Sequence, residues 1–217
     1  ESFGAQGITI HPRPDERHIR YQDARDLKGV VKTELNIEGN PVEKFINLVL
    51  EVQPDQVTLV PDSVDAITST LVPDDINQIT SNAGWDTIKN RLFLKEVIAE
   101  FKSHGIRTSI FVDRVAEMIE GAKETGTDRI ELYTEAFAEG FKEGHPNAVK
   151  PYVDAALLAQ DLDLGLNAGH DLSLENIKFF ADSIPGLLEV SIGHALIAEA
   201  LYDGLEKTIQ SYLEALS

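Results

Sequence analysis

The sequence has 217 residues, 42% of them hydrophobic and 26% charged, which is enough for one large domain with a full core. Its formal net charge of −18 excludes a general nucleic-acid-binding surface, and it repels anionic ligands at long range. The absence of cysteine excludes disulfides and thiol catalysis and is compatible with a reducing cytoplasm, where we expect the protein to lie. No window reaches the roughly 18 apolar residues of a membrane span, and no signal-peptide pattern opens the chain, so we expect no membrane partner.

Short apolar runs of strand length alternate with helical stretches along the whole chain. This alternation predicts parallel strands with crossover helices, arranged either as an open doubly wound sheet or as an eight-stranded barrel. We favour one TIM (β/α)8 barrel over residues 1–217, with its first strand missing, because the opening ESFGAQG resembles the tail of a helix. The predicted strands cover residues 7–11, 31–37, 56–60, 107–112, 129–133, 164–167 and 188–192.

Four helices are clear from their apolar spacing and end signals. The stretch NPVEKFINLVLEV predicts a helix that Asn40 caps and in which Pro41 takes the first position. A second helix is predicted from a capping Asp86 to residue 105, with three side chains turned inward: Ile88, Leu92 and Phe101. Two more are predicted over residues 173–186 and 194–216.

A near-repeat of twelve residues interrupts the regular pattern. The stretch LVPDSVDAITST at 59–70 is followed at once by LVPDDINQITSN at 71–82. Two copies are too few for a solenoid. We interpret the segment as a local duplication, with one copy in the barrel wall and the other looped out.

Polar residues gather after the predicted strands, where barrels of this type carry their chemistry. Four of the six histidines follow strands within a turn or two, and they are His11, His18, His170 and His194. One such histidine would be interpreted as a solvated or capping side chain, but four with Glu38 and Glu131 indicate a site. Glu38 can face the interior and exchange protons with substrate, or it can form an ion pair there. Histidine is its natural partner near neutral pH.

Two groups of nitrogen donors indicate anion binding. Gly193 and His194 precede a helix after the last strand, where free backbone N–H groups and the helix dipole favour a phosphate. Arg13 and His18 would form a second anion site on the opposite side of the mouth. Alternatively, RPDERHIR is a charged surface loop with internal pairs such as Asp15 with Arg17. Two anion sites would suit two phosphorylated molecules, or one with a phosphate at each end.

The residue types at the strand ends also argue against other chemistries. Lysine is absent from every strand end, which counts against an enzyme-bound Schiff base. Histidines with carboxylates resemble the ligands of barrel metalloenzymes, yet no H-x-H or H-x-x-x-H pair occurs. We therefore favour acid–base chemistry and expect neither metal nor cofactor.

Five motifs resemble those of the pyridoxine 5′-phosphate synthase family, in order from the first residue to the last. They are GITIHPRPDERHI, LNIEGN, LVPDDINQITSNAGWD, GLNAGHDLS and SIGHALI. The resemblance implies a homo-oligomeric TIM barrel that condenses 3-amino-2-oxopropyl phosphate with 1-deoxy-D-xylulose 5-phosphate. Pyridoxine 5′-phosphate, inorganic phosphate and water would be the products, and no cofactor would be needed.

The resemblance also implies roles for single residues. His11 and Glu38 match proton acceptors, and His170 matches a proton donor. Thr68 occupies in the first copy of the near-repeat the place that Thr80 has in the second. Asp171 stands where relatives can have glycine, which adds negative charge near a phosphate. The residues implied in substrate binding are Arg13, His18, Thr80, Glu131, Asp171, Gly193 and His194.

Two other functions are compatible with the same sequence. One is a metal-dependent isomerase or hydrolase acting on a sugar phosphate. The other is a truncated or duplicated copy that keeps the fold and the oligomer but cannot bind both substrates.

Overall fold

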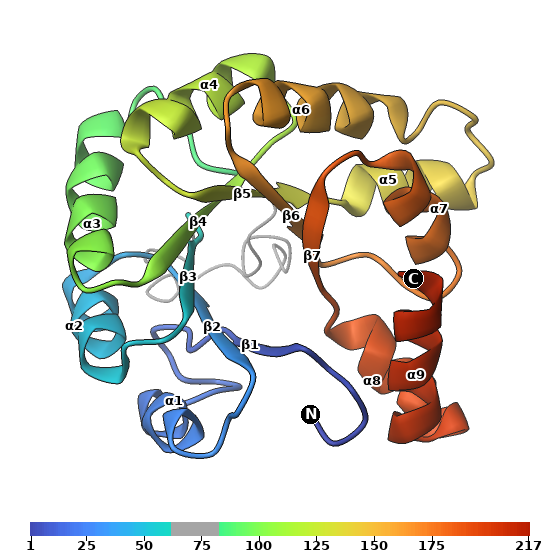
Figure 1. Ribbon diagram of the computed structural model, residues 1–217, viewed down its shortest axis with the longest axis horizontal. Helices are drawn as coiled ribbons and strands as arrows, with labels where there is room; N and C mark the ends of the chain where they lie inside the picture. The colour runs from blue at the N-terminus through green and yellow to red at the C-terminus, as the bar shows by residue number, and fades with distance from the viewer. Residues whose placement is uncertain (62–82) are drawn as a thin grey trace, which may run out of the picture.

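Parallel strands and intervening helices form a ring in the computed structural model, which describes residues 1–61 and 83–217 (Figure 1). Neighbouring strands pair in parallel in chain order, from β1 to β7. The sheet curves into a nearly closed barrel, which confirms the predicted TIM-barrel class. The strands are β1 (Gly7–Ile10), β2 (Glu34–Gly39), β3 (Gln56–Leu59), β4 (Arg107–Val112), β5 (Arg129–Tyr133), β6 (Gly165–Gly169) and β7 (Leu187–Ser191).

The helices lie around the outside of this ring (Figure 1). None of those in the described ranges is long and apolar enough to cross a membrane. They are α1 (Tyr21–Lys28), α2 (Glu43–Val52), α3 (Arg91–Ser103), α4 (Ala116–Thr125), α5 (Glu135–Lys142), α6 (Lys150–Asp161), α7 (Ile177–Ser183), α8 (His194–Asp203) and α9 (Leu205–Ala215).

The barrel is open between its first and last strands. β1 and β7 are the two ends of the strand order, and they do not pair with each other in the described part of the chain. At this opening the hydroxyl oxygens of Thr9 and Ser191 lie 3.4 Å apart. The expected strand before residue 1 stays a prediction, and the near-repeat lies almost wholly outside the described residues.

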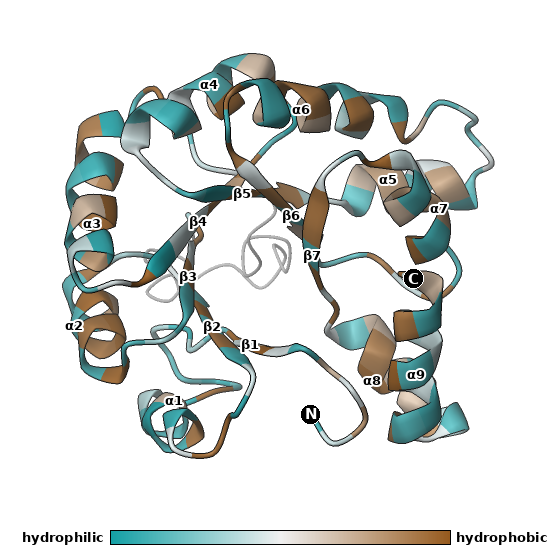
Figure 2. Cartoon of the chain, in the orientation of Figure 1, coloured by the Kyte–Doolittle hydropathy of each residue, from teal (hydrophilic) through white to brown (hydrophobic). Residues whose placement is uncertain are grey.

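Side chains alternate between the two faces of each strand, as the period of two requires. In β2, Leu35 and Ile37 are buried in the hydrophobic core, whereas Asn36 turns inward and accepts a hydrogen bond from Thr58 at 3.2 Å. β6 and β7 are largely hydrophobic (Figure 2). The core therefore lies between strands and helices, and polar residues occupy the barrel interior.

Two arginines organise the amino-terminal end of that interior. Arg129 donates to Glu189 at 2.6 Å and to Asn167 at 3.2 Å. Arg107 donates to Gln56 at 2.8 Å and pairs with Glu34. Because each of these arginines contacts a carboxylate, the charges at this end of the barrel are compensated.

The first two predicted helix starts were too early. Val42, not Asn40, is the cap of α2, which begins at Glu43, and Asp86 caps a separate turn by accepting the Lys89 N–H at 2.8 Å. The inward positions of Ile88 and Leu92 were also wrong, since 52% and 74% of these residues are exposed.

The helical period explains the second error. Leu92 and Phe101 are nine residues apart, about two and a half turns, so they lie on opposite sides of α3. The buried stripe consists of Leu94, Val97, Ile98 and Phe101.

The predicted terminal helix is broken in two. Gly204 has φ +84°, a left-handed conformation that glycine adopts at little cost, and it separates α8 from α9. α8 has no buried residue, whereas Thr208, Ile209 and Tyr212 of α9 are buried. The break ends α8 at Asp203 and lets α9 pack as a separate helix, whereas the predicted start at His194 is confirmed.

Two leucines of α3 provide a test of this packing. Leu94→Ala should lower the free energy of unfolding by about 2–5 kcal/mol, because it leaves a cavity in the core. Leu92→Ala should change it by less than about 0.5 kcal/mol, since that side chain is exposed. Urea denaturation measures both, and equal losses would contradict the orientation of the helix.

Candidate active site

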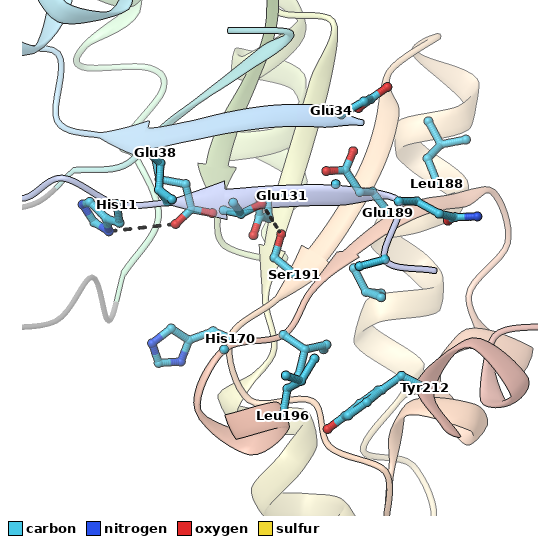
Figure 3. Close-up of a pocket in the computed structure, with 18 of the residues that line it drawn as sticks. His11, Glu34, Glu38, Glu131, His170, Leu188, Glu189, Ser191, Leu196 and Tyr212 are labelled. Atoms are coloured by element: carbon cyan, nitrogen blue, oxygen red, sulfur yellow. Dashed lines mark hydrogen bonds and ion pairs between the residues drawn. The ribbon is translucent and has the colours of Figure 1, made fainter. Parts of the chain in front are cut away.

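An open cleft of about 910 Å³ runs along the opening between β1 and β7, from Glu34 and Leu187 at the amino-terminal end of the barrel to residues beyond the carboxyl ends of the strands. Figure 3 shows His11, Glu38, Glu131 and His170 around the same hollow, although they come from four different strands or the turns after them. Of the residues singled out in the sequence, those that line the cleft are His11, Arg13, His18, Glu38, Glu131, His170, Gly193 and His194.

Strand register brings the first two of these side chains together. Ile10 of β1 pairs with Ile37 of β2, so the next residue of each strand, His11 and Glu38, also lie side by side. His11 Nδ1 is 3.9 Å from Glu38 Oε2, and each side chain is 19% exposed. This separation allows an ion pair when the imidazole is protonated, and both groups remain within reach of a ligand in the cleft.

Glu131 lies deeper, in the middle of β5 rather than at its end. Its residue is 4% exposed, and Oε2 has no hydrogen-bond partner among the described residues. Burial raises the pKa of this carboxyl well above its usual range, and the charges of Glu38 and Glu189 raise it further. The low-dielectric interior therefore favours the neutral, protonated form of this carboxyl.

A glycine makes room for that carboxyl. A Cβ at Gly169 would lie 3.0 Å from Glu131 Oε1 and 2.8 Å from the Ser191 carbonyl oxygen. The carbonyl belongs to the backbone of β7 and cannot move aside easily. Only glycine fits at the end of β6 without displacing a neighbour.

His170 follows β6 directly and reaches the cleft from the turn. Its Nδ1 lies 2.8 Å from Asp171 Oδ2, and its ring meets the ring of Tyr133 edge-on, with centroids 5.4 Å apart. The Asp171 hydrogen bond raises the pKa of His170, while burial lowers it and the charges of Glu38 and Glu135 add to the rise. The net effect favours the imidazolium.

The anion-binding candidates flank the barrel opening. Gly193 is the cap of α8 and His194 its first residue, and a Cβ at Gly193 would meet nothing within 4 Å. Arg13 and His18 belong to the loop after β1. Because β1 and β7 are the two ends of the strand order, these two donor groups line the cleft from either edge of the opening.

Two other arginines of the stretch RPDERHIR form surface ion pairs, as the alternative interpretation predicted. Arg17 Nε donates to Asp15 at 2.5 Å, as that alternative proposed, and Arg20 forms a similar pair with Asp23 at 2.7 Å. The loop therefore divides its cations between surface pairs and the cleft.

Of the predicted site residues that the structure describes, Asp171 alone does not line the cleft, and it contacts His170. Thr80 lies outside the described residues. Sequence reasoning in turn missed Phe111, Glu189 and Ser191, which do line it. Strand alternation could have identified them, because each lies an even number of residues from another inward-facing residue of its strand.

No cluster of three or more His, Asp or Glu side chains suited to a metal ion occurs within residues 1–61 and 83–217. The cleft groups these side chains as separated acid–base partners. Such an arrangement can support proton exchange beside donors that suit an anion.

Comparison with known proteins decides the family. Residues 1–70 and 68–217 match the family described as "Pyridoxal phosphate biosynthesis protein PdxJ", and the two matches meet within the near-repeat. The chain belongs to this family. It is 68% identical to the pyridoxine 5′-phosphate synthase of Flavobacterium johnsoniae and 66% identical to that of Christiangramia forsetii. Each comparison covers 100% of this chain and 86% of the relative.

Members of the PdxJ family at this identity are enzymes, and so is this chain. Solved structures agree on the fold. A phosphoribosylanthranilate isomerase from Thermotoga maritima superimposes with a TM-score of 0.61 at 15% identity, covering 99% of this chain and 89% of that one. At so low an identity the likeness establishes the barrel and nothing about the reaction.

Glu131→Gln should flatten the pH dependence of stability. A carboxyl whose pKa is raised by folding stabilises the native state below its unfolded pKa, near 4.5, and this contribution is lost as pH rises through the folded pKa. The wild-type unfolding free energy, minus that of the variant, should therefore fall as pH rises above about 4.5. Denaturation at a series of pH values measures this difference.

The exposed Glu120 of α4 supplies a matched control, and Glu120→Gln should change stability little at any pH. A difference between wild type and Glu131→Gln that stayed constant or grew with pH would show that Glu131 is ionised in the native protein.

Proposed function

We propose that this chain is a pyridoxine 5′-phosphate synthase, which condenses 3-amino-2-oxopropyl phosphate with 1-deoxy-D-xylulose 5-phosphate. The products are pyridoxine 5′-phosphate, inorganic phosphate and water. The observation that carries the proposal is the convergence of His11, Glu38 and His170 with two groups of anion donors in a single cleft. Family membership and the names of close relatives support the same reaction.

The acid and base roles follow from the charges around each group. Glu38 and His11 accept protons, because a carboxylate and an imidazole 3.9 Å apart can share the charge that a proton brings. His170 donates protons to departing oxygens, because its partner Asp171 favours the imidazolium. Groups that are placed in this way typically contribute about 10²–10⁴ in rate each.

The two phosphate groups are assigned by motif and position. Gly193 and His194 bind the phosphate of the amino-ketone, because they line the cleft at the amino terminus of α8, where the first N–H groups of a helix lack partners within it and the helix dipole favours an anion. Arg13 and His18 bind the phosphate of the deoxyxylulose, for which the arginine fork can donate two parallel hydrogen bonds. Both groups lie beside the opening between β1 and β7, so the reactive carbons would meet over His170 and Glu38.

The amine for imine formation comes from the substrate itself. No lysine lines the cleft among the described residues, and residues 62–82 contain none in their sequence. An enzyme-bound Schiff base would require a lysine in reach of the ketone. Condensation of the two substrates with each other removes that requirement.

The wild-type protein should produce pyridoxine 5′-phosphate when both substrates are supplied, and no product with either one alone. A strong chelator should leave the rate unchanged, because the proposed groups act by proton transfer. Chromatographic detection of the product measures this. Activity lost with chelator and restored by a metal ion would favour a metal-dependent enzyme, and no product under any condition would favour a non-catalytic copy.

His170→Asn should abolish ring closure, with a loss of about 10²–10⁴-fold or more, because asparagine cannot donate the proton. Binding of each phosphorylated substrate, followed by calorimetry, should be largely retained since His170 is not a proposed phosphate ligand. Equal losses in binding and turnover would count against the donor role.

Gly193→Ala tests phosphate binding, whereas His170→Asn tests proton donation. Its methyl group enters open space, so folding should be unaffected, but it occupies the approach to the α8 amino terminus. We expect the dissociation constant of the amino-ketone phosphate to rise roughly tenfold or more, the effect of losing one charge-assisted hydrogen bond.

A further inference from the structure

The turn that carries His170 is held in an uncommon backbone conformation. His170 has φ +84°, in the left-handed region that residues other than glycine seldom adopt. Such a conformation persists only where the surroundings enforce it, and these cluster at functional sites. Here the His170 N–H donates to the Ser191 carbonyl at 3.3 Å, which ties the turn to β7.

Thr134 fixes the next peptide of the turn. Its hydroxyl donates to the Gly169 carbonyl at 2.5 Å and accepts the Asp171 N–H at 3.2 Å. From the other side, Asn176 Nδ2 lies 3.5 Å from the Asp171 carbonyl. The N–H and the carbonyl of Asp171 thus both have partners within the protein. Its carboxylate is the remaining polar group, and it is the one that contacts His170.

We propose that Asp171 is a positioning residue for His170, whose Nδ1–H it holds so that Nε2 is the nitrogen presented to the substrate. The inference rests on the proposed function of His170 as proton donor. Its basis is the 2.8 Å contact between His170 Nδ1 and Asp171 Oδ2. An ionised carboxylate only accepts hydrogen bonds, so Nδ1 is the donor in this pair and the tautomer is fixed.

The other neighbours of His170 act in the same direction. Tyr133 contacts the imidazole edge-on from β5, which limits rotation of the ring. The charged groups that face the imidazole are Asp171, Glu38 and Glu135, all of them carboxylates, and each raises its pKa. Among these, the Asp171 hydrogen bond has the largest effect, whereas burial of the ring opposes it.

The placement of Asp171 separates this role from contact with substrate. Asp171 does not line the cleft, while His170 does. A carboxylate beside a phosphate-binding wall would repel an anionic substrate, unless its charge were compensated. Pairing with the imidazolium supplies that compensation, so the same contact orients the acid and shields the substrate from the carboxylate.

Histidine titration in the substrate-free protein tests the contact directly. In ¹⁵N spectra of labelled wild type, with His170 assigned by the His170→Asn variant, Nδ1 should remain protonated when the ring becomes neutral. The opposite tautomer, with Nδ1 deprotonated, would overturn the proposal. This measurement needs no catalysis and no Asp171 variant, so it stands even if the reaction proves to be a different one.

Asp171→Asn tests the consequence for turnover. The imidazolium loses its charged partner, so the pKa of His170 should fall, and the decline of kcat with rising pH should move to lower pH because an acid works only while protonated. At pH 8 we expect kcat to drop at least about tenfold, as when a histidine loses its orienting partner, with KM for both substrates little changed. Asp171→Glu should restore part of the loss.

Asp182→Asn is the control. It removes the same charge from an exposed pair with Lys178 on α7 and should leave the pH profile as in wild type. If wild type forms product but Asp171→Asn keeps the wild-type profile and His170 titration, the positioning role is overturned. If wild type forms no product, the proposed reaction fails, and the tautomer alone decides the role of Asp171.

Discussion

The parallel register between neighbouring strands is the constraint on which the site depends. Because each strand runs in the same direction as the last, residues separated by more than 180 positions, His11 and His194, line the same cleft. The constraint is strict, since a slip of one residue in β2 would turn Glu38 toward the helices and Ile37 into the cleft. Strand register thus determines which side chains reach the cleft.

The barrel interior keeps its charges in two layers with different properties. At the amino-terminal end, Arg107 and Arg129 compensate the carboxylates of Glu34 and Glu189. Glu131, one layer higher, has no arginine contact of this kind, and burial raises its pKa. The paired carboxylates link neighbouring strands through their arginines, whereas burial favours the neutral form of Glu131 beneath the cleft.

Local sequence was sufficient to predict the strands and most of the rim. Strand ends are marked by short apolar runs followed by turns, and the barrel rule then places His11, Glu38, His170 and Gly193 together. The side of a helix is less certain, because an error of two residues reverses it, as Leu92 shows. Glu189 was missed for another reason: alternation along β7 indicates that it faces inward, but its partner Arg129 lies two strands away in β5, a pairing that the local sequence does not show.

The net charge of −18 repels anionic substrates at long range, so their binding depends on the charges inside the cleft. Screening limits surface charges to about 8 Å at physiological ionic strength, so the groups lining the cleft decide the potential inside it. There, burial favours the neutral form of Glu131, and the carboxylate of Asp171 contacts His170. Glu34 and Glu189, which also line the cleft, contact Arg107 and Arg129. In the proposed reaction, Glu38 beside His11 is then the carboxylate that faces the substrate phosphates, and the negative charge of each bound phosphate would favour transfer of a proton to it.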